Sequence, residues 1–191
     1  MAQGAWTSVG AEQSSDDDDD DDDDNGADMQ PGKELVMSAI TPCLWFESEA
    51  EEAAALYTAV VRNSRILTVA RSGAGDDAPA VSVSFELDGR PFLALNGAPA
   101  AAFSDAVSFQ IGCTSQDEVD HYWDSLTADG GQAGRCGWLK DRYGVSWQVV
   151  PTALPSLIGG EDAAGAQRAL AAMLTMEKLE IGVLERAYSG D

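Results

Sequence analysis

The sequence is poor in the residues that most often carry catalysis, with one histidine, His121, and three cysteines, Cys43, Cys113 and Cys136. An odd number of cysteines without paired spacing favours reduced thiols over a disulfide framework. A lone histidine leaves no Ser-His or Cys-His pair unless His121 itself supplies the base. Because His121 falls between two positions of an apolar helical stripe, helical geometry turns it outward, and we interpret it as a surface residue.

Positive charge and long apolar runs are also scarce. Lys and Arg number 11 against 33 Asp and Glu, for a formal net charge of −22. A strongly acidic surface argues against nucleic acid and anionic membranes as partners. No stretch approaches the ~18 apolar residues of a membrane-spanning helix, and the N-terminus lacks the basic start and apolar core of a secretory signal. These absences predict a cytoplasmic protein.

Residues 1–36 are dominated by an unbroken aspartate run, Asp16 to Asp24. Like-charge repulsion and few apolar residues leave little to offset the entropy of ordering, so we expect a disordered acidic tail. A solubilising role is the usual one for such a block; a metal sponge, a phosphate mimic or a contact for a basic partner are the alternatives. The rest is long enough for one compact domain, predicted as 37–152 with a C-terminal extension, 153–191.

That domain contains the same strand–helix sequence pattern twice. A predicted strand, Ile40–Phe46, is followed by Ser48 and Glu51 in capping-box spacing, and a second strand, residues 106–113, is followed by Ser115 and Glu118 in the same spacing. An apolar helical stripe comes after each cap at matching intervals: Ala53, Leu56, Tyr57 and Val60, then Val119, Tyr122, Trp123 and Leu126. The pattern indicates an internal duplication.

Short strands follow each predicted helix. In the first unit they are Arg65–Arg71, Val81–Leu87 and Arg90–Asn96, the last two joined by the hairpin signal Asp88-Gly89. In the second, a Gly-rich piece at 130–137 precedes a hairpin from Trp138 to Pro151 around an Asp141–Gly144 turn. Each unit therefore predicts a β-α-β-β-β module, at about 38–97 and 105–151, in an α+β fold. Helical apolar spacing predicts C-terminal helices beyond residue 153.

Several segments resemble the vicinal oxygen chelate superfamily, which includes glyoxalases, bleomycin-resistance proteins and ring-cleaving dioxygenases. The Asp-x-x-Gly-x-x-Trp-Gln strand ending at Gln148 resembles its closing strand. Five segments are similar to the PhnB-like branch, whose members often carry the name demethylubiquinone methyltransferase: Leu44–Phe46, Pro91–Gly97, Val107–Gln110, Gly137–Asp141 and Met176–Tyr188. The resemblance implies two modules forming a curled mixed sheet around a cleft, and a homodimer.

The resemblance also implies where the cleft residues lie. Metal ligands of the superfamily come from the first and last strand of each module, positions that here carry Thr41, Leu93, Ser108 and Gln148. A transition metal prefers imidazole, thiolate or carboxylate ligands, so we predict neither metal nor other cofactor. Strand alternation adds two neighbours on the same face. The predicted cleft residues are Thr41, Cys43, Leu93, Ser108, Gln110 and Gln148.

The function predicted on these grounds is metal-free binding of a small organic molecule. The alternatives are a metal-dependent isomerase, lyase or dioxygenase, and an interaction module in which the acidic tail dominates; whether any reaction is catalysed stays open. Methyl transfer is not supported, because a nucleoside cofactor in the usual fold needs a Gly-rich loop that opens a helix. The only close candidate, Gly73-Ala-Gly75, is followed by residues typical of a hairpin loop.

Overall fold

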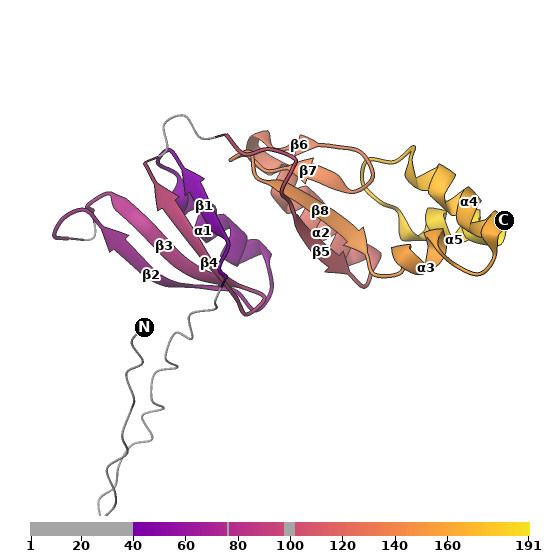
Figure 1. Cartoon of the computed structure of the whole chain (residues 1–191), viewed down its shortest axis with the longest axis horizontal. Coiled ribbons are helices and arrows are strands. Elements are labelled where there is room, and N and C mark those ends of the chain that lie inside the picture. The colour runs from indigo at the N-terminus through magenta and orange to yellow at the C-terminus, as the bar shows by residue number, and fades with distance from the viewer. Residues whose placement is uncertain (1–39, 76, 98–101) are drawn as a thin grey trace, which may run out of the picture. The chain divides into compact units, whose positions relative to one another are not determined.

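The computed structural model describes residues 40–75, 77–97 and 102–191 (Figure 1). These residues all belong to one unit, 37–191. The acidic run predicted to be disordered lies outside them. No helix in the described ranges has the length and apolar character that crossing a membrane requires.

The first module is a four-stranded sheet with one helix across it (Figure 1). Its elements are β1 (Cys43–Phe46), α1 (Ala50–Val60), β2 (Arg65–Arg71), β3 (Ala80–Leu87) and β4 (Arg90–Asn96). The strand order is β1-β4-β3-β2, with β1 parallel to β4 and the other pairs antiparallel. Asp88 and Gly89 both have positive φ, 48° and 71°, as a two-residue hairpin of the predicted kind demands.

The second module repeats this topology. Its elements are β5 (Phe109–Cys113), α2 (Gln116–Thr127), a short 3₁₀ helix η1 (Ala128–Gly130), β6 (Gln132–Ala133), β7 (Trp138–Lys140) and β8 (Ser146–Pro151). The order is β5-β8-β7-β6, and β5 is parallel to β8. The predicted α+β class and the two modules are confirmed.

The two modules begin their helices in different ways. In α2 the predicted cap is confirmed, since Ser115 Oγ accepts the Glu118 N–H at 3.3 Å. In α1 the predicted Ser48–Glu51 capping box is wrong, because the helix starts at Ala50 without a side-chain cap from its flanking residue. The Glu51 carboxylate instead binds Arg71 on β2, at 2.7 Å. Asn96, at the end of β4, accepts the Ala50 N–H at 2.9 Å and serves as the cap.

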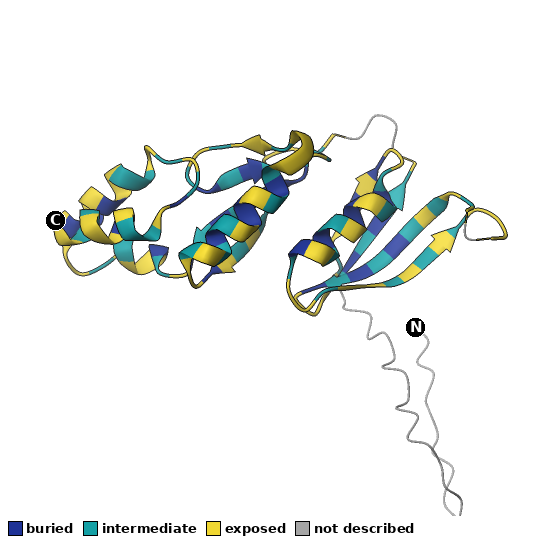
Figure 2. Ribbon diagram, turned by 180° about the vertical axis from the view of Figure 1, so that it is seen from behind, coloured by how far each residue is buried: buried dark blue, intermediate teal, exposed yellow. Residues whose placement is uncertain are grey.

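One hydrophobic core joins both modules. Helices α1 and α2 each pack across their own sheet, and buried residues, dark blue in Figure 2, occur along both helices and along the strands beneath them. All four stripe residues of α2 are buried, whereas Leu56 of the predicted α1 stripe is only half-buried and Ala50 and Ala54 are buried in addition. Tyr57 of α1 meets Trp147 of β8 with ring centroids 5.2 Å apart. Burial of such large side chains is the main stabilising term, about 1.5–3 kcal/mol each.

The C-terminal extension is helical, as predicted, and consists of α3 (Leu154–Ile158), α4 (Ala163–Met173) and α5 (Ile181–Ser189). They enclose a small second core of Leu154, Leu179 and Leu184. The turn before β7 holds the extension, because Cys136 N and Gly137 N donate to the carbonyls of Met176 and Glu177 at 2.9 and 2.8 Å. A side chain at position 137 would approach the Val149 carbonyl to 2.6 Å, so only glycine fits there.

Candidate functional site

The face of the second sheet that α2 does not cover carries several polar side chains. Cross-strand pairing aligns Gln110, Gln148 and Trp138 in one row across β5, β8 and β7. Because partners in a row share a face, their neighbours Phe109, Trp147 and Leu139 lie on the opposite side, under α2. We call the uncovered side, with the two residues bonded to it, the polar face: Asp105, Ser108, Gln110, Gln132, Trp138, Lys140, Ser146 and Gln148.

Side-chain hydrogen bonds organise the polar face. Gln148 Nε2 donates to Ser108 Oγ at 2.8 Å. Ser146 Oγ donates to Asp105 Oδ1 at 2.8 Å, and the Lys140 ammonium lies 3.2 Å from the same oxygen. The bonds from Ser146 and then Lys140 lower the pKa of the Asp105 carboxyl. Asp105 therefore stays ionised near neutral pH and is a weak base.

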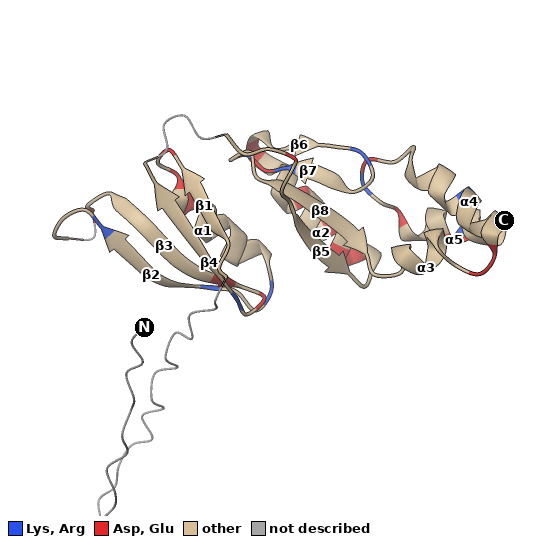
Figure 3. Cartoon of the chain, in the orientation of Figure 1, with Lys and Arg blue, Asp and Glu red and all other residues tan. Residues whose placement is uncertain are grey.

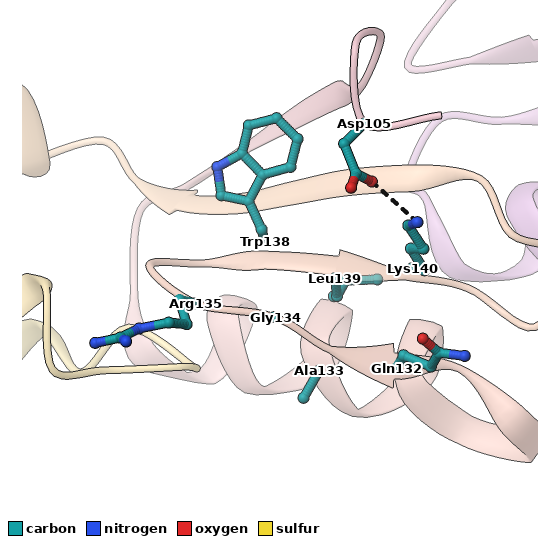
Figure 4. A pocket seen from close by; sticks show the side chains of 8 residues that line it. All are labelled: Asp105, Gln132, Ala133, Gly134, Arg135, Trp138, Leu139 and Lys140. Carbon is teal, nitrogen blue, oxygen red and sulfur yellow. Dashed lines mark ion pairs between the residues drawn. The ribbon is translucent and has the colours of Figure 1, made fainter. Parts of the chain in front are cut away.

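A cavity of about 420 Å³ opens on this face, a size typical of small-molecule sites. Figure 4 shows Trp138 and Arg135 at one end, and Gln132 with the Asp105–Lys140 pair at the other. The indole ring offers an aromatic surface, and the amide and ammonium groups offer hydrogen-bond donors. Such an arrangement can orient a small molecule that has both an apolar and a polar part.

The six predicted cleft residues fall into two groups. Ser108, Gln110 and Gln148 lie together on the polar face. Cys43 on β1 pairs with Leu93 on β4, in the same way that Gln110 on β5 pairs with Gln148 on β8. The duplication thus places the two pairs at equivalent positions of their sheets, with Thr41 just before β1. Within the described ranges, no hydrogen bond joins the first group to the second.

The first group offers little chemistry. Leu93 has no polar side-chain atom, and desolvation raises the pKa of the Cys43 thiol, which disfavours the nucleophilic thiolate. Trp45, on the same face of β1 as Cys43, leaves 52% of its surface exposed. The first group is therefore better suited to contact than to catalysis.

Five polar-face residues are not among the six predicted cleft residues: Asp105, Gln132, Trp138, Lys140 and Ser146. Lys140 could have been found, because it is two residues from Trp138 on the same strand and must share its face. Gln132 lies on a strand of two residues, too short to show alternation. Asp105 lies in the segment between the modules, where no pattern marked it.

Potential metal donors are dispersed. Among the described residues, no three His, Cys, Asp or Glu side chains gather as a group able to hold a metal ion. His121 is exposed on α2, as predicted, and its Nε2 lies 3.0 Å from the carbonyl oxygen of Val60 at the end of α1. The histidine therefore links the two helices and lies on the helix side of the sheet.

The comparisons with known proteins fit this architecture. The model of the 3-demethylubiquinone-9 3-methyltransferase family matches residues 38–150. The chain belongs to this family. It is similar to the structure of a putative 3-demethylubiquinone-9 3-methyltransferase, PhnB protein, from Bacillus cereus, at 30% identity and a TM-score of 0.55, over 60% of this chain and all of that one (100%). The predicted PhnB-like membership of the vicinal oxygen chelate superfamily is confirmed.

More distant structures match at lower scores. A protein from Pseudomonas aeruginosa is 19% identical over 59% of this chain and 96% of its own, with a TM-score of 0.48. The fosfomycin resistance protein FosX from Listeria monocytogenes is 12% identical over 61% of this chain and 94% of its own, with a TM-score of 0.43. No curated protein matches the chain.

Proposed function

We propose that this family member binds a small organic molecule on its polar face, without a metal. The hydrogen bond from Gln148 to Ser108, 2.8 Å long, carries the proposal. At two positions where the superfamily resemblance implies metal ligands, this chain has an amide and a hydroxyl that bond to each other. These groups recognise a ligand through neutral hydrogen bonds, and the Trp138 ring beside them contacts its apolar part.

The residues present do not fit a transition metal. Two hydroxyls, an amide and a leucine, at Thr41, Ser108, Gln148 and Leu93, lack the charge and donor strength that such an ion requires. Asp105, the carboxylate on the polar face, is already engaged by Ser146 and Lys140. A metal-dependent isomerase, lyase or dioxygenase is therefore the second candidate, and it depends on ligands other than these.

Methyl transfer is not proposed, despite the family's name. The glycines Gly73 and Gly75 lie in the loop between β2 and β3, so no helix starts where they end. A nucleoside cofactor bound in the usual way needs the amides of such a helix start. The described residues do not fit that group.

Metal content decides between the two candidates. The full-length protein, dialysed and then analysed for zinc, nickel, iron and manganese, should contain far less than one ion per chain. A content of about one ion per chain that survives dialysis would overturn metal-free binding, because structural and catalytic sites hold their metals stoichiometrically.

Ligand binding is tested by thermal stabilisation across a small-molecule library. A ligand present at about 100 times its Kd should stabilise the fold by about 2.7 kcal/mol. The substitutions Gln148→Ala and Trp138→Ala should each abolish the stabilisation, whereas Gln167→Ala, which removes an exposed amide from α4, should not. A hit that both polar-face variants still bind equally well would place the ligand elsewhere.

We also propose that the protein is a homodimer through its C-terminal helices. Leu170, Leu174 and Val183 remain 40%, 50% and 39% exposed on and next to the packed pair α4 and α5. A second copy is the simplest partner for an apolar patch of this kind, since most soluble oligomers are symmetric homodimers.

A further inference from the structure

A second cavity, of about 590 Å³, follows the edge of β5. It touches every residue from Ser108 to Gly112, and β5 is an edge strand of its sheet. Since successive side chains of a strand point to opposite faces, a cavity that touches all of them must run along the strand's edge. Pro42, Leu87 and Phe92 of the first module form the opposite wall. We call this cavity the edge groove.

The inner part of the edge groove is aromatic. Phe92 and Phe109, one from each module, meet edge to face with ring centroids 5.2 Å apart. Tyr122 of α2 and Trp147 of β8 also border the groove. Such a lining favours an apolar body, above all a flat ring, over a fully hydrated ion.

The mouth of the edge groove carries Arg62, Asp88 and Arg90, two guanidinium groups against one carboxylate. Figure 3 shows blue and red segments side by side at this end of the first module. Glu118 pairs with one of these guanidinium groups, that of Arg62, so the exposed guanidinium of Arg90 is the group at the mouth that favours an anionic ligand.

Hydrogen bonds between two turns fix the mouth in place. Gly89 N donates to the Asn63 carbonyl and Asp88 N to Ser64 Oγ, both at 3.1 Å. These bonds tie the β3–β4 turn to the segment after α1, which carries Arg62. The arginines are therefore held on a preorganised frame, and less ordering is needed when a ligand binds.

The side chains of Arg62 and Arg90 differ in their partners. Arg62 pairs with Glu118 of α2 at 2.6 Å. The Arg90 side chain is exposed and, within the described part of the chain, its guanidinium makes no hydrogen bond or ion pair. Its guanidinium can form a two-pronged bond with a carboxylate without breaking any existing contact. The outer N–H groups of an edge strand, here β5, add further donors.

We propose that the edge groove is a second ligand site, which binds a small organic carboxylate with a flat apolar body. The carboxylate lies at the mouth against Arg90, and the apolar body lies along β5 against Phe92 and Phe109. The edge groove shares Ser108 and Gln110 with the polar face, but none of the residues that line it borders the 420 Å³ cavity beside Trp138.

Benzoate, with uncharged benzamide as its matched probe, tests the proposal on the full-length protein. Titration followed by calorimetry and by backbone amide shifts should show saturable benzoate binding, with shifts at 108–112, and much weaker benzamide binding. Arg90→Gln should weaken benzoate binding by about tenfold or more, as loss of a charge-assisted pair implies. Arg65→Gln removes the same charge from a nearby arginine that does not line the groove, and it should change little.

Several results would overturn the edge-groove site. One is the absence of saturable binding up to ~10 mM benzoate, and another is an equal affinity for benzamide. A third is an equal loss of benzoate affinity in Arg90→Gln and Arg65→Gln, which would indicate a general charge effect. Shifts confined to 138–140 and 146–148 would assign benzoate to the polar face instead. Because Arg90 is exposed, its variant should melt at the wild-type temperature, so a loss of binding can be read directly.

Discussion

Tyr57 Oη on α1 donates a hydrogen bond of 2.8 Å to Asp141 Oδ2 at the β7–β8 turn. The same oxygen accepts Trp147 Nε1 at 2.8 Å, while Oδ1 accepts the N–H groups of Tyr143 and Val145 at 2.9 and 3.0 Å. Asp141 is only 3% exposed, and burial raises the pKa of both its carboxyl and the Tyr57 phenol. A buried carboxyl with four donors thus connects the first module to the second.

We expect Tyr57→Phe to destabilise the fold by about 1.5–3 kcal/mol, because it removes a hydrogen bond to a buried charged group. Urea unfolding at neutral pH measures the change. Tyr122→Phe is the matched control, since the Tyr122 hydroxyl makes no hydrogen bond within the described residues, and it should cost less than about 0.5 kcal/mol. Equal losses in both variants would show that the Tyr57–Asp141 bond contributes little.

The two helix starts predict opposite outcomes for equivalent serines. Ser115→Ala should cost about 1 kcal/mol, because it removes the cap of α2, whereas Ser48→Ala should be nearly neutral. Asn96→Ala should be destabilising like Ser115→Ala, since Asn96 caps α1 from β4. Denaturant midpoints of the three variants test the assignment, and a destabilised Ser48→Ala would contradict it.

A designed metal site should test whether Ser108 and Gln148 converge. Their bonded atoms are 2.8 Å apart, so Ser108→His combined with Gln148→Glu should place an imidazole and a carboxylate within reach of one ion. Two ligands give only weak affinity, so we expect zinc binding in the high micromolar range that the single variants lack. Calorimetric titration measures it. Identical weak binding by wild type and the double variant would mean that the side chains do not converge there.

Docking of the C-terminal extension should depend on pH through an ion pair between Lys178 and Asp120. The Lys178 Nζ lies 2.8 Å from the Asp120 Oδ1. The bonds from Lys178 and then Gln116 lower the pKa of the Asp120 carboxyl. The ion pair therefore adds to the free energy of unfolding at any pH above the unfolded-state pKa of an aspartate, about 3.9. This contribution is lost as the pH falls through the lower pKa that Asp120 has in the folded state. When the free energy of unfolding is measured between neutral and acid pH, Asp120→Asn should lose less of it on acidification than the wild-type protein does. Asp117→Asn on the same helix is the control, because Asp117 makes no ion pair within the described ranges. This variant should lose as much free energy of unfolding at acid pH as the wild-type protein.

The proposed dimer predicts that charge on the C-terminal patch produces monomers. Leu174→Glu should shift the mass measured by light scattering at micromolar concentration from two chains to one, because a buried unpaired carboxylate costs several kcal/mol. Glu177→Gln nearby should leave the dimer intact. A wild-type protein that is already monomeric would refute the dimer.

Much of the fold could be predicted because the signals were local and repeated. The second apolar stripe, Val119 to Leu126, is buried as the sequence pattern indicated, and β2 and β4 have the predicted bounds. The cap of α1 could not be predicted, because the residue that supplies it, Asn96, is 46 positions away. Sequence spacing identifies local partners and gives no sign of distant ones.

The candidate site was predictable only in part, for a related reason. Strand alternation added Gln110 to the predicted cleft, and Gln110 does pair with Gln148 across β5 and β8; Asp141 also bonds the backbone of the turn that it was predicted to begin. The second oxygen of Asp141 binds two side chains, one of them Tyr57 from the other module, and this pairing had no sequence signal. Asp105 belongs to the polar face because it accepts a hydrogen bond from Ser146, and no sequence pattern predicts this contact either.

The different caps of α1 and α2 have a kinetic consequence. The α2 cap closes across three residues, so it can form as soon as the helix nucleates. The α1 cap spans 46 positions and requires β4 to be in place, so its loop-closure entropy must be offset by other contacts first. We expect the second module to acquire protected helical amides before the first when the chain refolds. Two copies of one architecture would then fold in the reverse of their order along the chain.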